Sequence, residues 1–243
     1  MLYQTLSLTR ALTIYVAQGL VFAVFLYLAY KILKRDKKRL NAIFAGFYLS
    51  PAIGLFLNFI YAPLDIPQIL VVLNFLTNFG IFYAPIFMLV FELILLKSEK
   101  VITKIKQNLI LIGYGIIMFC MIFFIFIPIN GEYGVTMNED TNWSPKWSTP
   151  FFLYLIFIES LAIIPVFFLA FQIYTKFEDN SLKRKWRSFI YGLIFLTIFM
   201  YGIFVSNFLA DATFRLIMGI VGIILGIAGA FLMYRGVGRQ LEK

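Results

Sequence analysis

Residues 150–175 read PFFLYLIFIESLAIIPVFFLAFQIYT, and this stretch decides the fold. Its only charged residue is Glu159. An α-helix needs about 20 mostly apolar residues to cross a bilayer core of about 30 Å, and this run is long enough. Strands of a membrane barrel alternate apolar and polar residues over about 10 positions, and this run does not. The stretch therefore predicts a transmembrane helix.

Comparable apolar runs recur along the chain. The predicted spans cover 11–33, 42–61, 68–96, 109–129, 150–175, 189–210 and 216–234. Apolar residues make up 62% of the 243 residues and charged residues 14%, with a mean hydropathy of +0.90. In ordinary soluble domains, about 45–50% of the residues are apolar and about 25% are charged. We therefore predict an all-α integral membrane bundle of seven transmembrane helices, forming one domain over 1–243 of a multi-pass cell-membrane protein.

The basic residues predict the orientation of this bundle. All but three of the 21 Lys and Arg residues follow the odd-numbered spans, and the exceptions are Arg10, Lys146 and Arg215. Cytoplasmic loops carry the excess of Lys and Arg, so we expect the N-terminus outside and the C-terminus in the cytoplasm. The net charge of +9 then indicates attraction to anionic headgroups of the cytoplasmic leaflet and not to nucleic acid.

Residue types that the sequence lacks or nearly lacks exclude several kinds of catalytic and metal site. The chain has no His and one cysteine, Cys120, which excludes a His general base, an intrachain disulfide and a Cys- or His-based metal site. Acid–base catalysis inside the membrane would have to use Glu92, Glu159 or Asp211, without a His or Cys partner. We therefore expect no enzymatic activity, no metal and no cofactor.

Polar residues inside the spans predict the candidate site, because such residues are costly in a membrane. Counted at about 1.5 Å per residue, six of them lie at similar depth in the outer half or near the midplane. These six are Gln18, Asn58, Asn74, Asn78, Glu159 and Asn207. One interpretation is a set of interhelical hydrogen bonds, each worth about 0.6 kcal/mol. The other is an outward-facing cavity for a small polar or cationic ligand, which would match the acidic outer loop at 130–149.

Two tryptophans stand in that outer loop. Trp143 and Trp147 precede the fifth span, where aromatic residues anchor helices at the membrane surface, so we predict anchors. The alternative is a lid over an outer cavity. Asn142-Trp143-Ser144 matches the N-x-S acceptor of N-glycosylation, and the sequence leaves its use open.

The loop at 176–188 carries a candidate cytoplasmic contact surface for a signalling partner. Its residues are Lys183, Arg184, Lys185, Trp186 and Arg187.

Proline and small residues predict local features of the spans. Pro85 should kink the long third span and Pro165 the fifth, since proline removes a helix hydrogen bond. Small residues allow membrane helices to approach closely. Two such stripes are Gly46, Ser50 and Gly54 in the second span and Gly219, Gly222, Gly226 and Gly229 in the seventh. We expect them to face neighbours within the bundle, with a second protomer, and hence a homo-oligomer, as the alternative.

Several seven-span families are excluded by their motifs. Retinal proteins need a Lys in the middle of the seventh span, which is absent here. G-protein-coupled receptors carry an Asp/Glu-Arg-Tyr motif after the third span, where this chain reads LKSE at 96–99. Sugar transporters of the SWEET type use a proline in the first span, and this one has none.

The layout is similar to the seven-span sensor modules found at the N-terminus of some prokaryotic histidine kinases and as stand-alone proteins. The resemblance covers the whole chain and includes Trp143-Ser144-Pro145 in the outer loop and the Asn-rich, Pro-containing third span. It implies membrane sensing. Because the chain has no His and no kinase sequence follows its last span, it implies output through a partner. A small-solute transporter or transporter subunit is the alternative function.

Overall fold

The computed structural model describes residues 8–35 and 38–238. Within these residues it has seven helical spans long and apolar enough to cross a membrane. They are Leu12–Arg35, Arg39–Tyr61, Pro67–Lys97, Lys104–Phe126, Thr149–Lys176, Asn180–Leu209 and Ala212–Val237. The predicted seven-helix, all-α architecture is confirmed at this level, and the chain is a candidate multi-pass membrane protein.

The fourth and sixth spans begin furthest ahead of their predicted starts at 109 and 189. The fourth starts at Lys104 and the sixth at Asn180, well before their apolar runs. Thr103 and Asp179 precede these helices, and each side chain accepts a hydrogen bond from a backbone N–H of the first turn. Capping of this kind starts a helix within polar sequence, where hydropathy alone gives no signal.

Three spans are built from one helix and four are composite. In the first, α1 (Leu8–Ala11) leads into the π-helix η1 (Leu12–Gln18) and α2 (Gly19–Arg35); the second is α3 (Arg39–Tyr61); the third is α4 (Pro67–Phe82) and α5 (Ala84–Lys97). The fourth comprises α6 (Lys104–Phe119), the 3-10 helix η2 (Cys120–Ile122) and α7 (Phe123–Phe126). The rest are α8 (Thr149–Lys176), α9 (Asn180–Leu209) and α10 (Ala212–Met233), which η3 (Tyr234–Gly238) extends.

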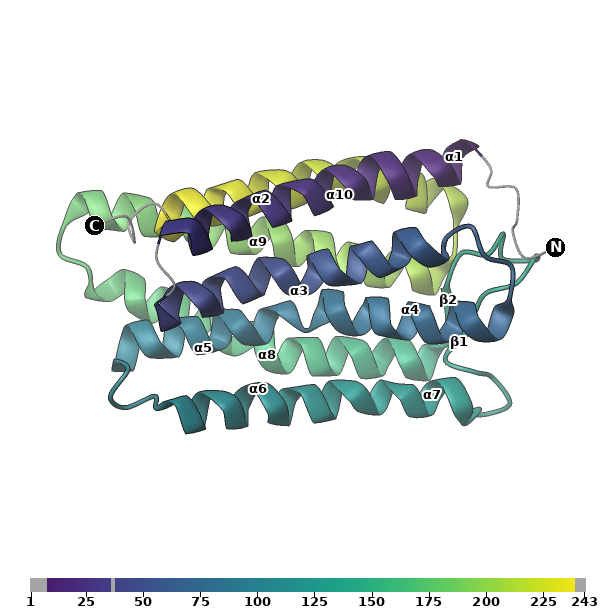
Figure 1. Cartoon of the computed structure of the whole chain (residues 1–243), viewed down its shortest axis with the longest axis horizontal. Coiled ribbons are helices and arrows are strands. Elements are labelled where there is room, and N and C mark those ends of the chain that lie inside the picture. The colour runs from purple at the N-terminus through teal and green to yellow at the C-terminus, as the bar shows by residue number, and fades with distance from the viewer. Residues whose placement is uncertain (1–7, 36–37, 239–243) are drawn as a thin grey trace.

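The two ends of the bundle differ. Strands β1 (Val135–Thr136) and β2 (Lys146–Trp147) pair antiparallel, with Val135 opposite Trp147, and lie at the end where α1 begins (Figure 1). We call this the hairpin end. The opposite end is the basic end, where α2, α5 and α8 finish in Arg35, Lys97 and Lys176.

Proline acts differently in two spans. The third span breaks at Tyr83, and Pro85 occupies the first turn of α5, where a missing N–H costs little. The predicted interruption is confirmed there. In contrast, α8 continues as one helix through Pro165.

Six spans form a closed ring. In order around it, α2 packs on α3, α3 on α4 and α5, α5 on α8, α8 on α9, α9 on α10, and α10 on α2. The fourth span lies outside this ring, with α6 against α5. Figure 1 shows α6 along one edge of the molecule and α2 with α10 along the other.

Small residues allow α3 and α4 to approach closely. A Cβ atom at Gly54 would lie 2.6 Å from the carbonyl oxygen of Thr77, and one at Gly80 would lie 2.9 Å from the backbone nitrogen of Gly54. Ser50 Oγ donates a hydrogen bond of 2.6 Å to the Gly80 carbonyl. This contact fixes the part of α4 that carries the candidate Asn residues.

The glycine stripe of α10 faces α9. Gly222 and Gly226 lie against the ring of Phe199, and Gly229 meets the carbonyl of Gly192. A Cβ at Gly219, in contrast, would meet no atom within 4 Å. Three members of the stripe therefore pack within the chain, and the fourth borders open space.

Two apolar cores fill the bundle. In the basic half, Phe44, Tyr48, Phe91 and Phe189 are fully buried, and the Tyr48 hydroxyl donates 3.1 Å to the carbonyl of Ala230. Toward the hairpin end, a second core joins α4 to α9 with the hairpin.

Trp147 belongs to that second core. It is 2% exposed and packs edge-on against Phe82 and Phe151, with ring centroids 6.2 and 5.3 Å away. The expectation that Trp147 anchors the chain at the membrane surface is therefore wrong, because the hairpin folds it inward.

Candidate ligand-binding site

A cavity of about 920 Å³ occupies the ring at the hairpin end. All six ring spans and the loop at 140–146 line it, whereas α6 supplies none of the described lining residues. On α9 the lining runs from Asn207 to Leu193, which is about 20 Å at a rise of about 1.5 Å per residue. Spaces between bundle helices are common sites for small-molecule ligands, and this volume is near the upper end of their range of about 300–1,000 Å³.

The first span contributes through its π-helix. Thr13, Ile14, Ala17 and Gln18 of η1 line the cavity. Short π-helical segments are rare and occur frequently at functional sites. Nothing in the apolar run of this span indicated one.

Five of the six predicted polar residues meet at this cavity: Gln18, Asn58, Asn74, Asn78 and Asn207. Gln18, Asn58, Asn74 and Asn78 are also hydrogen-bonded, so the two interpretations offered by the sequence coexist. Asn58 Nδ2 donates to Gln18 Oε1 between the first two spans. Asn74 Nδ2 donates 2.9 Å to the Tyr61 hydroxyl, and Asn78 Nδ2 donates 2.9 Å to Asn74 Oδ1.

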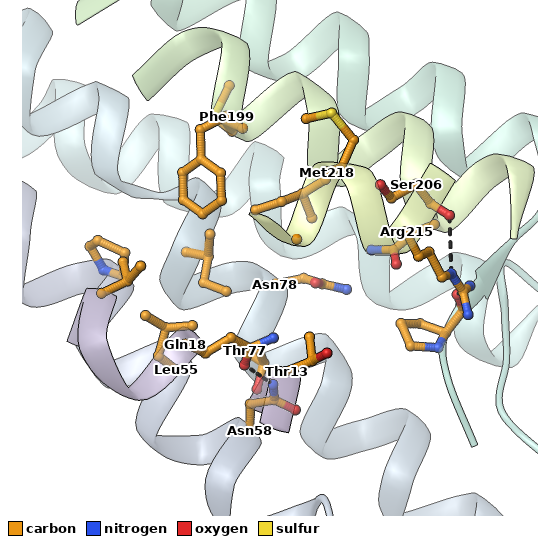
Figure 2. Close-up of a pocket in the computed structure, with 18 of the residues that line it drawn as sticks. Thr13, Gln18, Leu55, Asn58, Thr77, Asn78, Phe199, Ser206, Arg215 and Met218 are labelled. Atoms are coloured by element: carbon orange, nitrogen blue, oxygen red, sulfur yellow. Dashed lines mark hydrogen bonds between the residues drawn. The ribbon is translucent and has the colours of Figure 1, made fainter. Parts of the chain in front are cut away.

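Figure 2 shows how these side chains lie. The amide of Asn78 extends into the middle of the cavity, with Phe199 and Met218 on one side and Thr77 and Leu55 on the other. A polar group thus projects into a space whose deeper walls are apolar.

Glu159 is not part of the cavity lining. It is fully buried in α8, and its carboxyl lies beside the hydroxyl of Tyr114 from α6, in the second core. The neighbouring Ser160 is hydrogen-bonded to Tyr201 at 2.8 Å. The prediction that Glu159 joins the other five residues is wrong, because depth along a helix does not fix which neighbours a side chain meets.

The other two carboxylates considered for catalysis also lie elsewhere. Glu92 is fully buried in α5, and Asp211 caps α10 by accepting a 2.7 Å hydrogen bond from the Phe214 backbone N–H.

The residues that sequence reasoning missed are cations. Arg10, Lys146 and Arg215 all line the mouth of the cavity. Arg10 Nη2 donates 3.0 Å to the carbonyl of Trp143, and Arg215 Nη2 donates 2.6 Å to that of Pro145. These are the three Lys and Arg residues that the orientation argument left on the outer side. The sequence therefore singled these residues out, but their wide separation along the sequence gave no indication that they meet in space.

The side chains at the mouth carry more positive than negative charge, which disfavours a cationic ligand. Of the described acidic residues, only Asp140 lines the cavity together with these three cations. Partial burial lowers the pKa of the Arg10 guanidinium from its usual value, and nearby Tyr61 offsets part of this effect. The outer loop is acidic as a whole, but of its acids only Asp140 lines the cavity, whereas Glu132 and Glu139 do not.

The loop at the mouth has a constrained shape. Asn142 and Trp143 adopt positive φ angles of 48° and 56°, which are uncommon for non-glycine residues. The Trp143 N–H donates 2.8 Å to the carbonyl of Asn138, which closes the turn. Trp143 lines the cavity, a position that fits the lid interpretation.

The predicted contact surface lies at the basic end, on helix α9 and not in a loop. Arg184, Lys185 and Arg187 are exposed and Lys183 is half-buried. Trp186 is 3% exposed, and its Nε1 donates 2.7 Å to the carbonyl of Ala170. Trp186 is therefore a packing residue between α8 and α9, and its assignment to a contact surface is wrong.

Comparisons with protein-family models, with curated proteins and with solved structures found no match.

Proposed function

We propose that this chain is a membrane sensor: a receptor-like module that binds a ligand in the cavity of its hairpin end and contacts a signalling partner at its basic end. The proposal places the hairpin end outside the cell membrane and the basic end in the cytoplasm, following the distribution of Lys and Arg.

Helix α9 is the observation that carries the proposal. It is one uninterrupted helix of 30 residues, about 45 Å long at about 1.5 Å per residue. Its last turns supply Ser206 and Asn207 to the cavity, and its first turns carry the exposed Arg184 and Lys185. A ligand that shifts the outer part of this helix would therefore move the basic surface with it.

Packing in the basic half supports sensing over transport. A transporter must open its site alternately to both sides of the membrane. Below the cavity, Phe44 and Phe91 stack with ring centroids 4.9 Å apart, and the buried hydroxyl of Tyr48 ties α3 to α10. Opening a path there would separate fully buried aromatic side chains, whereas sensing needs only a shift of intact helices.

Two measurements test the proposal. A photo-crosslinking amino acid at Arg184 should capture a soluble protein in native membranes, whereas the same group at Glu139, exposed at the hairpin end, should not. In liposomes containing the purified protein, mixed radiolabelled amino acids, sugars and organic acids should show no saturable uptake. Saturable uptake, or equal capture from both positions, would contradict the sensor assignment.

A further inference from the structure

The charge around the cavity is the opposite of that on the surrounding surface. Of the acids at the hairpin end, Asp65, Glu132, Glu139 and Asp211 do not line the cavity, and Asp140 does. The described cations of the same end all line it: Arg10, Lys146 and Arg215. Cations gathered at the mouth of a cavity in an otherwise acidic surface favour an anionic group there.

These cations converge on one short segment. Arg10 comes from the start of the first span and Arg215 from the start of the seventh, and both reach the backbone between Trp143 and Lys146. A guanidinium has five N–H donors, and the bonds of Arg215 to Pro145 and Ser206 engage Nη2 and Nε. Neither bond uses the Nη1 donors of Arg215.

Beneath the mouth, the lining becomes apolar. Below Asn78 and Thr197, side chains such as Phe25, Phe47 and Leu193 form the walls. A small inorganic anion would leave these walls uncovered. A molecule that combines one anionic group with an extended apolar chain would match both parts of the cavity.

Volume limits the size of that molecule. At the roughly 30 Å³ that a water molecule occupies in the liquid, a cavity of about 920 Å³ has room for about 30 non-hydrogen atoms. That is enough for one long acyl chain with an ionised head. It is too few for a phospholipid with two chains.

We propose that the cavity binds a single-chain anionic amphiphile, a long-chain carboxylate or a lysophospholipid, with its head at Arg10, Lys146 and Arg215 and its chain directed toward Phe25 and Leu193. This inference rests on the proposed function in that it names the ligand class of the same cavity.

Binding of tritiated palmitate to the full-length protein in zwitterionic nanodiscs tests whether the cavity prefers an anionic head group. Unlabelled palmitate and lysophosphatidylglycerol should compete, and the tighter of the two identifies the source of the ligand. Hexadecan-1-ol should compete at least tenfold more weakly, and hexadecylamine should not compete. Equal competition by the amine, or by two-chain phosphatidylglycerol, would overturn the proposal.

Variants test where each part of the amphiphile lies. Arg215→Gln should weaken palmitate binding at least tenfold, whereas Arg235→Gln, exposed at the basic end, should leave it unchanged. Because Arg215 also holds the loop, Lys146→Gln provides a second charge test at an exposed position and should weaken binding severalfold.

Gly219→Leu tests the position of the ligand's acyl chain without altering the charge of the protein. Its side chain would enter the open space of the cavity and should weaken palmitate binding at least tenfold. The matched Gly113→Leu on α6, also with no atom within 4 Å of its Cβ, should have no effect. Unchanged binding by Gly219→Leu would overturn the assigned position.

The outcomes separate this inference from the sensor proposal. Palmitate binding together with saturable palmitate flux across liposomes would support the ligand class and refute sensing. Absence of saturable palmitate binding, with partner capture from Arg184 intact, would refute the ligand class alone.

Discussion

Replacing Gly54 by Ala should destabilise the protein, although Ala is the better helix former. The new Cβ would lie 2.6 Å from the Thr77 carbonyl oxygen and 2.9 Å from the Ile81 backbone nitrogen. Neither backbone atom can rotate away, so α3 and α4 must separate. Overpacking of this kind costs roughly 1–3 kcal/mol. The higher helix propensity of Ala offsets up to about 1 kcal/mol of this cost.

With the full offset, the net loss for Gly54→Ala is up to about 2 kcal/mol. For a protein of this size, 1 kcal/mol changes Tm by about 2–4 °C, so Tm should fall by up to roughly 8 °C. Circular dichroism of the detergent-solubilised protein, heated at one fixed rate, measures this change.

The control is Gly113→Ala in α6, where a Cβ would meet no atom within 4 Å. Tm should rise there by roughly 1–4 °C, because only the gain in helix propensity of about 0.5–1 kcal/mol remains. If both variants raise Tm alike, the close approach of α3 and α4 is refuted.

Three further changes have defined expected outcomes. Asp211→Ala removes the cap of α10 and should lower the free energy of unfolding by about 1 kcal/mol, whereas Asp211→Asn should retain most of it, as thermal denaturation will show. Trp186→Phe loses the hydrogen bond to Ala170 and should cost about 1–2 kcal/mol by the same assay, and unchanged stability would contradict its packing role. The backbone N–H of Ser181 lowers the pKa of Asp179, so the charged carboxylate stabilises α9. Its contribution to stability should be complete above the ordinary Asp pKa of about 3.9 and should be lost as the pH falls through the lowered pKa. The difference in stability between the native protein and Asp179→Ala should therefore be constant from about pH 7 to 5 and shrink only in stronger acid.

The seven spans were predictable because a bilayer imposes a minimum apolar length on every crossing. A disturbance of the third span near Pro85 was predictable from the missing N–H of proline, but the same reasoning applied to Pro165, and α8 continues through it. The early starts at Lys104 and Asn180 were not, because the caps that set them lie in polar sequence outside the apolar runs.

The site was only partly predictable. Counting along each helix placed Asn58, Asn74 and Asn78 at one depth, and the structure brings them to one cavity. The same count could not exclude Glu159, because a span that is apolar all round gives no sign of which neighbours it packs against. The meeting of Arg10 and Arg215 depends on ring closure between the first and last spans, which no local pattern encodes.

Ring closure also has a consequence for the synthesis of the protein. Proteins are synthesised and inserted from the N-terminus, so α2 lacks its packing partner α10 until α10 has emerged from the ribosome. The cavity then lacks the wall formed by the seventh span, which carries Arg215, Met218 and Gly219. A nascent chain with six spans therefore cannot hold a ligand in an enclosed site. In the proposed sensor, ligand binding would therefore be a property only of finished molecules.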